Sequence, residues 1–384
     1  MKVAIITSTR ADFGLLFPLI KELENDIEFD VTVIATGSHL DHKRGYTVDE
    51  IYHSGINNII TVETDVADTS DLGISITASD TLHKMSLTLD KLDPDLVIIL
   101  GDRYEILSTA FSAFLLKKPI AHISGGDVTS GALDDSIRHS ITKLSSIHFT
   151  TTEAYKKRVI QLGEEPSKVF NVGNLCIDNF KKINKASKEE LENFLGFNLS
   201  NCSQNILVTL HPETTYSSQA ELNTIFFTAL KKLKDTGIII TYPNHDAGSD
   251  EIIKHIQSLQ RCLPEHVCVK ESLGMRYYHS LLQYVNAVIG NSSSGITEVP
   301  SYGIPTIDVG NRQEGRIRAN SVFNCSYNEQ EITALLKYVL EPNIQSQIKN
   351  TVNPYGDGNT SEKIVSILKK ISPPNLIKKK FYDI

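Results

Sequence analysis

The chain has 384 residues, 40% of them hydrophobic, which is more than one hydrophobic core usually serves and predicts two domains. Its 38 basic and 46 acidic residues give a formal charge of −8, which excludes a general electrostatic attraction to nucleic acid or to an anionic membrane. No apolar run reaches the roughly 18 to 20 residues of a membrane span, and the N-terminus shows no signal pattern, so we expect a soluble cytoplasmic protein. The five cysteines lack metal-ligand spacing, and we expect them to be reduced thiols.

Five short apolar runs, each followed by a segment of helical period, fill the first half of the chain. They are Val3 to Thr7, Val31 to Ala35, Ile59 to Val62, Leu96 to Leu100 and Pro119 to Ile123. Runs that are apolar on both faces, such as Leu96 to Leu100, are typical of parallel strands covered by helices on both sides. Residues 1–175 are therefore predicted to form a doubly wound, Rossmann-like α/β domain.

The alternation pauses in the charged stretch from Lys181 to Asn193 and then restarts. The second set of strand candidates is Ile206 to Leu210, Ile238 to Tyr242, His266 to Val269, Ala287 to Gly290 and Pro305 to Val309. Residues 176–360 are therefore predicted to form a second Rossmann-like domain. When two such sheets face one another, the carboxyl ends of their strands meet at an interdomain crevice, where we expect the active site.

The remaining segment, residues 361–384, begins with a helix predicted at about Ser361 to Ile371. We expect this helix to pack back across the first domain. The basic run Lys378 to Lys380 near the end of the chain is predicted to be a solvated tail rather than a binding arm.

The first predicted strand leads into a helix through a segment that contains Arg10 and Asp12. Free backbone N–H groups and an arginine at such a position suit a phosphate. The alternative is that Asp12 is a simple N-cap and Arg10 lies on the surface. The segment is not a glycine-rich dinucleotide fingerprint, so NAD is not predicted.

Two further strand ends carry charged or titratable side chains. Asp102 and Arg103 follow the fourth predicted strand, where α/β enzymes project catalytic groups into the crevice. The alternative for this acid and base is a satisfied ion pair with a helix cap. His211 follows the first strand of the second half, which places it at the crevice, although a lone histidine is often structural.

The fifth predicted strand ends in the segment His122 to Asp127, whose two glycines let the backbone approach a ligand closely. The segment continues past Gly131 to Asp134 and Asp135, which lie at a predicted helix start, with Arg138 on the same turn region. Capping alone is the alternative explanation for the two aspartates.

Serines gather after a later strand, in the segment Gly290 to Pro300. Ser292 and Ser293 stand at a predicted helix N-terminus, where N–H groups, hydroxyls and the helix dipole together bind a phosphate. Glu298 is placed to accept hydrogen bonds from ribose hydroxyls, and Arg312 after the next strand could complete a diphosphate clamp.

Taken together and in this order, these segments resemble the UDP-N-acetylglucosamine 2-epimerase family over nearly the whole chain. That family has two facing Rossmann-like domains, the GT-B-like architecture of one large class of glycosyltransferases. Four segments resemble its hydrolysing branch, which serves sialic acid and related nonulosonic acid synthesis: His122 to Lys143, Gly290 to Gly295, Gly310 to Gln313 and Phe381 to Ile384.

The resemblance implies roles for individual residues. Phosphate and nucleoside contacts fall on Arg10, Arg103, Ser292, Ser293, Glu298 and Arg312. Acid/base roles fall on Asp102, Asp134 and His211, with Arg138 as a neighbouring support. Where several family members carry a glutamate, this chain has Ser124, and we hypothesise that Asp127 supplies the missing acid/base group.

The resemblance also implies a reaction: conversion of UDP-N-acetylglucosamine and water to N-acetylmannosamine and UDP, by elimination through 2-acetamidoglucal and then hydration. It implies no metal and no redox cofactor, and it suggests a homodimer or homotetramer. The alternatives are the same reaction on UDP-2,4-diacetamido-2,4,6-trideoxyglucose for legionaminic acid synthesis, a non-hydrolysing epimerase, a glycosyltransferase, and a non-catalytic UDP-sugar binding protein.

Overall fold

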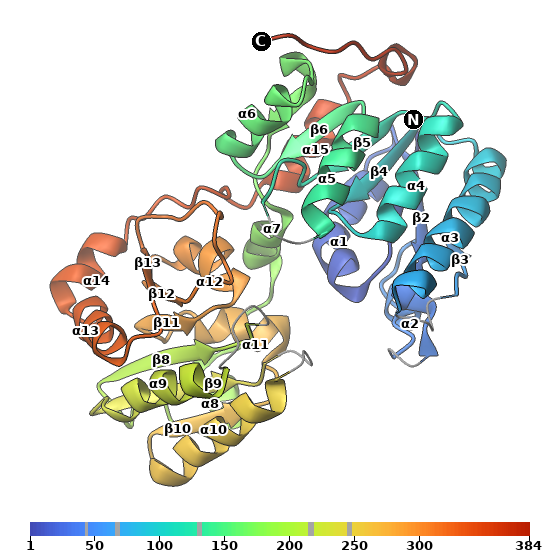
Figure 1. The fold of residues 1–384 in the computed structure, drawn as a ribbon. Helices are drawn as coiled ribbons and strands as arrows, with labels where there is room; N and C mark the ends of the chain where they lie inside the picture. Colours follow the sequence, from blue (N-terminus) through green and yellow to red (C-terminus); the bar gives the residue numbers. More distant parts are fainter. Residues whose placement is uncertain (43–44, 66–69, 129–132, 214–218, 244–247) are drawn as a thin grey trace. The chain divides into compact units, whose positions relative to one another are not determined.

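The structure is a computed structural model that describes residues 1–42, 45–65, 70–128, 133–213, 219–243 and 248–384. It forms two compact units (Figure 1): unit 1 comprises Met1–Asn179 and Tyr355–Ile384, and unit 2 comprises Phe180–Pro354. The chain leaves unit 1 four residues after the predicted boundary at 175 and returns to it six residues before the predicted start at 361. Gly131, part of a predicted site segment, lies outside the described residues.

The sheet of unit 1 has seven parallel strands in the order β3-β2-β1-β4-β5-β6-β7. The strands are β1 (Lys2–Thr7), β2 (Asp30–Thr36), β3 (Ile59–Val62), β4 (Leu96–Leu100), β5 (Ile120–Ile123), β6 (Ile147–Thr150) and β7 (Val169–Asn171). The helices are α1 (Arg10–Glu24), α2 (Val48–Tyr52), α3 (Asp71–Leu92), α4 (Tyr104–Leu115), α5 (Leu133–Leu144), α6 (Glu153–Gln161), α7 (Leu175–Lys182), within which the unit boundary falls, and α15 (Thr360–Leu368).

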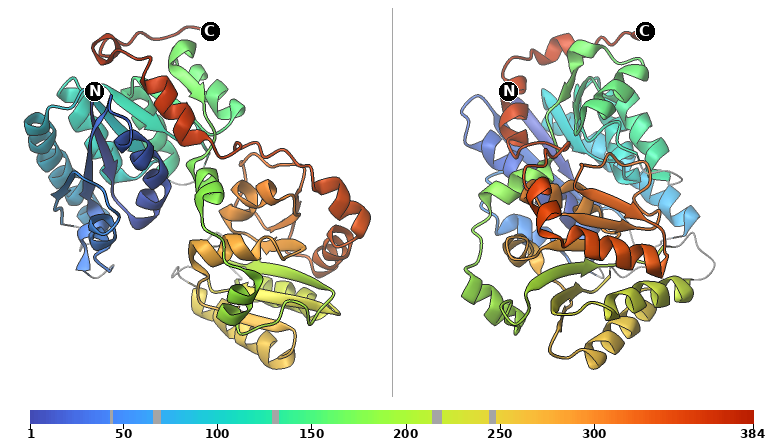
Figure 2. Two further views of the ribbon diagram at one scale, coloured as in Figure 1. Left: turned by 180° about the vertical axis from the view of Figure 1, so that it is seen from behind. Right: turned by 90° about the vertical axis from the view of Figure 1, so that its left-hand side faces the viewer.

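Both faces of this sheet are covered, as the two-faced apolar strands require. Along β1, Val3 and Ile5 belong to a core cluster shared with α1 and α15, whereas Ala4 and Ile6 belong to a second cluster shared with α3, α4 and α5. Helix α15 packs against α1 (Figure 2), although most of the chain separates the two helices in sequence. Its Ile364 is completely buried in the first cluster.

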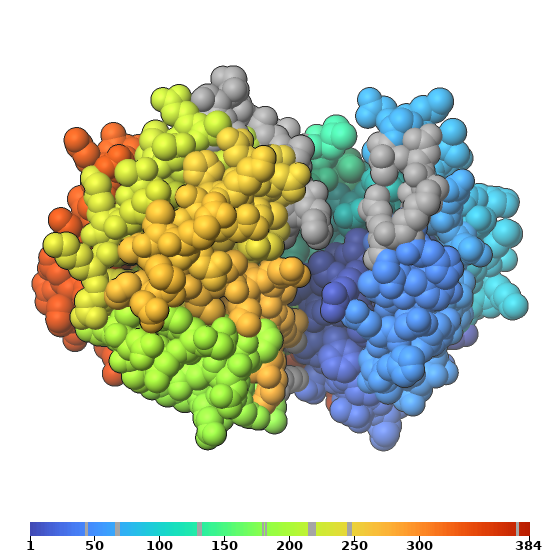
Figure 3. All heavy atoms as spheres, turned by 90° about the horizontal axis from the view of Figure 1, so that it is seen from below, coloured from blue at the N-terminus to red at the C-terminus, as the bar shows by residue number. Residues whose placement is uncertain are grey.

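The sheet of unit 2 has six parallel strands in the order β10-β9-β8-β11-β12-β13. The strands are β8 (Gln204–Thr209), β9 (Thr236–Thr241), β10 (Val267–Lys270), β11 (Ala287–Gly290), β12 (Thr306–Val309) and β13 (Val322–Cys325). The helices are α8 (Lys188–Leu195), α9 (Gln219–Lys231), α10 (Ser249–Cys262), α11 (Gly274–Leu281), α12 (Ser293–Thr297), α13 (Glu329–Val339) and α14 (Pro342–Ile348). In the space-filling view of Figure 3, the green segment around α8 and the yellow to orange segments around α10 and α11 lie on the side of this unit that faces the viewer.

The doubly wound parallel α/β fold predicted for both halves is confirmed, and all ten predicted strands exist with bounds within two residues. Strands β6, β7 and β13 were not predicted. In each sheet the order of strands reverses at one central pair, β1 with β4 and β8 with β11. Ligands of such sheets bind outside the carboxyl ends of the strands at this reversal. Among the described helices, none is long and apolar enough to cross a membrane.

Candidate active site

The turn after β4 carries Asp102, and a buried histidine fixes that turn. His122 on β5 is fully buried, and its Nε2 donates a hydrogen bond of 2.8 Å to the carbonyl oxygen of Gly101. Burial lowers the pKa of His122 to about 3, so the imidazole is neutral at physiological pH. Gly101 itself has φ of 80°, which favours glycine, so the chain can turn sharply between the buried strand and Asp102.

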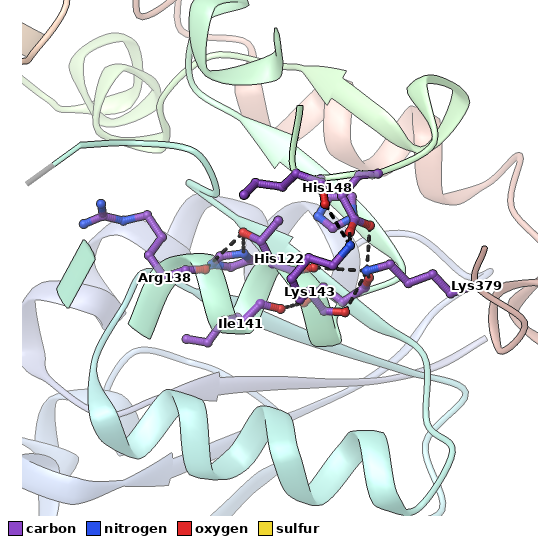
Figure 4. A network of polar contacts seen from close by, with 10 residues as sticks. His122, Arg138, Ile141, Lys143, His148 and Lys379 are labelled. Carbon is purple, nitrogen blue, oxygen red and sulfur yellow. Dashed lines mark hydrogen bonds and ion pairs between the residues drawn. The ribbon is translucent and has the colours of Figure 1, made fainter. Parts of the chain in front are cut away.

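Arg138 on α5 connects three segments of this region (Figure 4 shows its position). Its guanidinium forms an ion pair with the carboxylate of Asp102, donates to the carbonyl oxygen of Asp127 at 2.7 Å and lies 3.2 Å from a carboxylate oxygen of Asp135. Only 4% of the arginine side chain is exposed. The structure thus brings together Asp102, the backbone of Asp127 and the first turns of α5, which the sequence had predicted to act in one site.

The other two candidate carboxylates differ in their surroundings. Asp134 lies on the first turn of α5 and is exposed. Its pKa is raised, mainly because the carboxyl is partly removed from water and to a smaller extent because of the negative charge of Asp102. The carboxylate of Asp127 accepts a hydrogen bond of 2.8 Å from the hydroxyl of Thr151, which follows β6. The charge of Asp102 thus acts on Asp134, whereas Asp127 is held by a hydroxyl of a neighbouring strand end.

The two predicted cationic groups of unit 1 have different partners. Arg10 is exposed and pairs with Glu50 at 3.0 Å. Arg103 pairs with the buried Glu105 at 3.2 Å, and its charge also interacts with Asp12. The suggestion that Asp12 caps α1 is wrong: Thr9 is the N-cap and accepts the backbone N–H of Asp12 at 3.1 Å.

In unit 2 the two central strands are joined at their carboxyl ends by Asn291. Its buried carboxamide accepts the backbone N–H of His211 at 2.7 Å and donates to the carbonyl oxygen of His211 at 2.9 Å. The preceding Gly290 has φ of 146°, and a Cβ there would lie 1.9 Å from the carbonyl oxygen of Thr209. Only glycine permits this close approach of β11 to β8, and the approach holds His211 at the sheet reversal.

The predicted phosphate-binding segment starts directly after Asn291. Ser292 is the N-cap of the short helix α12, its hydroxyl lies 3.1 Å from that of Ser294, and Ser293 is the first residue of the helix. The guanidinium of Arg312 donates to the carbonyl oxygen of Asn291 at 3.2 Å, so its charge lies beside this segment. Hydroxyls, helical N–H groups and a guanidinium are the donors that a diphosphate needs.

Glu298, one turn further along, lies beside the buried His279 and the half-buried Tyr302. The Nε2 of His279 is 3.4 Å from its carboxylate, and the Nδ1 of His279 is 3.0 Å from the hydroxyl of Tyr302. Burial raises the pKa of Glu298 to about 7 and lowers that of His279 to about 4. Near neutral pH the Glu298 carboxyl can therefore both donate and accept hydrogen bonds, which suits ribose hydroxyls.

Comparison with known proteins decides the family. A family model described as UDP-N-acetylglucosamine 2-epimerase matches residues 21–369. The chain belongs to this epimerase family. Its parallel α/β units are also those of solved epimerases: the enzyme from Neisseria meningitidis bound to UDP-GlcNAc (22% identity, TM-score 0.81, 97% of this chain and 100% of that one) and one from Listeria monocytogenes described as putative (20%, 0.78, 97% and 98%).

Three curated relatives cover most of the chain, and two of them are hydrolysing epimerases by name. It is 38% identical to the hydrolysing GDP/UDP-N,N'-diacetylbacillosamine 2-epimerase of Campylobacter jejuni over 85% of both chains. It is 35% identical to polysialic acid biosynthesis protein P7 of Escherichia coli, over 100% of this chain and 97% of that one. It is 31% identical to the hydrolysing UDP-N,N'-diacetylbacillosamine 2-epimerase of Legionella pneumophila, over 96% of each chain.

Three buried polar residues near the candidate residues of the two units were not singled out from the sequence. Asn291 and His122 hold the turns described above, and Glu213 is buried between the hydroxyl of Tyr327 at 3.1 Å and the backbone N–H of Asn311 at 3.4 Å. Asn291 and Glu213 follow buried strands, which is the signal that identified Asp102, whereas His122 lies within β5. Among the described residues, no group of three or more His, Cys, Asp or Glu side chains could hold a metal ion.

Proposed function

We propose that the protein is a hydrolysing UDP-N-acetylglucosamine 2-epimerase that produces N-acetylmannosamine and UDP for sialic acid synthesis. The observation that carries the proposal is the group of carboxylates around Arg138, with the pKa of Asp134 raised beside Asp102, in a chain of this family. The full-length match to a polysialic acid biosynthesis protein supports the choice of product.

The chemistry starts from carbon 2 of the sugar, whose proton is only weakly acidic, while carbon 1 carries UDP as a good leaving group. A carboxylate removes the proton as the anomeric C–O bond breaks, which gives 2-acetamidoglucal and UDP. Water then adds across the double bond: a carboxylic acid protonates carbon 2 from the opposite face, and hydroxide is delivered to carbon 1. Two carboxyl groups in opposite protonation states are needed, and we assign these roles to Asp102 and Asp134, with Asp127 as a third candidate.

The leaving diphosphate needs cationic and N–H donors. We assign its binding to Ser292, Ser293 and Arg312 of unit 2 and to Arg10 and Arg103 of unit 1. Glu298 is assigned to the ribose, and His211 to a hydrogen bond or proton for the departing oxygen. The proposal requires that groups of both units act on one substrate molecule.

The second candidate is the same reaction on UDP-N,N'-diacetylbacillosamine, a 2,4-diacetamido-2,4,6-trideoxy sugar. The 38% and 31% identities to enzymes of that name favour it. Both reactions use the same bond changes at carbons 1 and 2, so the two proposals differ only in what the protein accepts at sugar carbons 4 and 6.

One experiment separates these proposals. The purified protein is incubated in deuterated water with each UDP-sugar, and products are identified by mass spectrometry and NMR. Free N-acetylmannosamine with deuterium at carbon 2 supports the first proposal, and turnover of the diacetamido sugar alone supports the second. Formation of UDP-N-acetylmannosamine would instead indicate a non-hydrolysing epimerase. Binding of UDP without turnover of either sugar would indicate a binding protein.

We also propose that the protein works as a homo-oligomer. Helices α3 and α4 pack against each other, and four of their large apolar side chains are 41% to 61% exposed: Leu87, Phe111, Phe114 and Leu115. Such a group of exposed apolar side chains is typical of a protein contact surface. Sedimentation analysis tests the proposal, and a monomer at micromolar concentration would contradict it.

A further inference from the structure

The C-terminal end of α5 is capped by a residue from the last segment of the chain. The ammonium nitrogen of Lys379 lies 3.2, 2.8 and 2.7 Å from the carbonyl oxygens of Thr142, Lys143 and Ser145 (Figure 4). The last carbonyls of a helix have no partner within the helix, and a cation there also complements the helix dipole. The predicted solvated tail is therefore wrong for Lys379.

Lys379 is also tied to α5 through a buried carboxylate. Glu164, with 2% of its side chain exposed, lies 2.6 Å from the ammonium groups of both Lys379 and Lys143 and accepts a hydrogen bond of 2.9 Å from His148. Burial raises the pKa of Glu164, but these donors outweigh it and hold the pKa at about 2. Because burial lowers the pKa of His148 and keeps its imidazole neutral, the two lysines supply the compensating charge.

The residues after Lys379 follow a fixed course over the same surface. The backbone N–H of Tyr382 donates to the carbonyl oxygen of Gly163 at 2.9 Å, and the ammonium of Lys143 lies 5.0 Å from the centre of the Phe381 ring. A Cβ at Gly163 would lie 2.3 Å from that ring. We call Lys379–Tyr382 the C-terminal clamp.

A short path of contacts leads from the clamp to the carboxylates. The carbonyl oxygen of Thr142 accepts a hydrogen bond from the ammonium group of Lys379. The hydroxyl of Thr142 donates a hydrogen bond of 3.0 Å to the carbonyl oxygen of Arg138 and lies 3.2 Å from Nδ1 of His122. Arg138 holds Asp102 directly, and His122 holds the turn that carries it. Thr142 thus connects the clamp to Arg138, one turn earlier on α5, and to His122 on β5.

We propose that the C-terminal clamp is a positioning element of the reaction, in which Lys379 fixes the end of α5 so that Arg138 and His122 keep Asp102 in place beside Asp134. This inference rests on the proposed function, because it assigns the catalytic carboxylates to these positions. It gives Lys379 a role in catalysis through its contacts with α5 and Glu164.

The test compares Lys379→Met with Lys379→Arg and with the matched control Lys378→Met, since Lys378 is exposed and the described residues give it no hydrogen bond or ion pair. In Lys379→Met we expect kcat to fall about 10- to 100-fold with little change in KM, because small displacements of catalytic groups cost this much. We also expect a larger isotope effect with substrate deuterated at carbon 2, since proton removal becomes slower. Lys379→Arg should restore most of the rate, and Lys378→Met should match the wild type.

Two measurements make the outcome decisive. Amide hydrogen exchange of residues 138–145 should be faster in Lys379→Met, and unchanged exchange would overturn the clamp. Faster exchange with an unchanged kcat would overturn the positioning role. A lower kcat with an unchanged isotope effect would also overturn it, because a loss of folded protein lowers the rate without changing the isotope effect.

A chain shortened by Phe381–Ile384 retains Lys379 and should show a smaller change of the same kind; a wild-type rate and exchange there would remove Phe381 and Tyr382 from the clamp. If the wild-type protein turns over neither UDP-sugar, the proposed function fails and the catalytic part of this inference fails with it. The exchange measurement still decides whether the clamp holds α5.

Discussion

Arg138 and Asp102 lie 36 residues apart in the chain and form an ion pair in which only 4% of the arginine side chain is exposed. The pair links α5 to the turn after β4, so the two segments that carry the candidate acid and base cannot move independently. Removing the carboxylate would leave the buried guanidinium charge of Arg138 without this compensation, which costs more than the ion pair itself contributes.

The first prediction concerns Arg138→Met. We expect kcat to fall about 100- to 1,000-fold, because Asp102 loses the group that orients it and offsets its charge. Affinity for UDP, measured by calorimetry, should change little, since we assign most UDP contacts to unit 2. Arg261→Met, which changes an exposed arginine of α10, is the control. A variant that loses UDP affinity and keeps its kcat would contradict the assignment.

The second prediction concerns Asp134, whose pKa is raised above the ordinary value of 3.8. If Asp134 acts as the base, the rate of the wild type should fall as the pH drops through this raised pKa, because the carboxylate takes up a proton. Asp134→Asn should lower kcat about 100- to 10,000-fold and remove that acid limb. Asp71→Asn, on the first turn of α3, should leave the pH profile unchanged.

Asn291 is the subject of the third prediction. Its carboxamide makes two hydrogen bonds to the backbone of His211, and Asn291→Ala would remove both of these buried hydrogen bonds. We expect a loss of about 1 to 3 kcal/mol in the free energy of unfolding together with weaker UDP binding. Chemical denaturation and calorimetry measure the two effects, with the exposed Asn350→Ala as control. Full UDP affinity in Asn291→Ala would show that His211 does not depend on this contact.

The fourth prediction concerns acid stability through Glu164, whose pKa falls from 4.5 to about 2 in the folded protein. A carboxyl with a depressed folded pKa stabilises the protein above its unfolded pKa, and this stability is lost as the pH falls from about 4.5 to about 2. Glu164→Gln should therefore be less stable than the wild type at neutral pH, and the difference should narrow over that range. The exposed neighbour Glu165→Gln should show neither effect.

Much of the fold could be predicted because the central strands are buried on both faces, so that β4 and most of β1 are uninterrupted apolar runs. Strands β7 and β13 lie at sheet edges, where the pattern is weaker, and β7 has only three residues. Strand β6 was missed for a different reason. It contains His148, a polar residue that is buried because Glu164 binds it, and a sequence pattern does not show such a partner.

Some residues of the candidate site could also be predicted from the sequence, and others could not. Asp102 and His211 follow buried strands, so the rule that strand ends carry function was enough to select them. The role of Lys379 depends on contacts with residues more than 230 positions away, such as Ser145, and nothing in a short basic run indicates them. Local pattern therefore selects candidate residues at strand ends, whereas the residues that hold them in place become evident only from the folded chain.

The position of α15 has a consequence for synthesis of the protein. Ile364 and Leu368 complete the core of unit 1, yet the ribosome reaches them only after it has made all of unit 2. Unit 2 is continuous in the chain and can fold as soon as it emerges, as domains made during translation generally do. The earlier-made segment Met1–Asn179 has to wait with part of its apolar surface uncovered, and this is the stage at which we expect the nascent chain to depend most on chaperones.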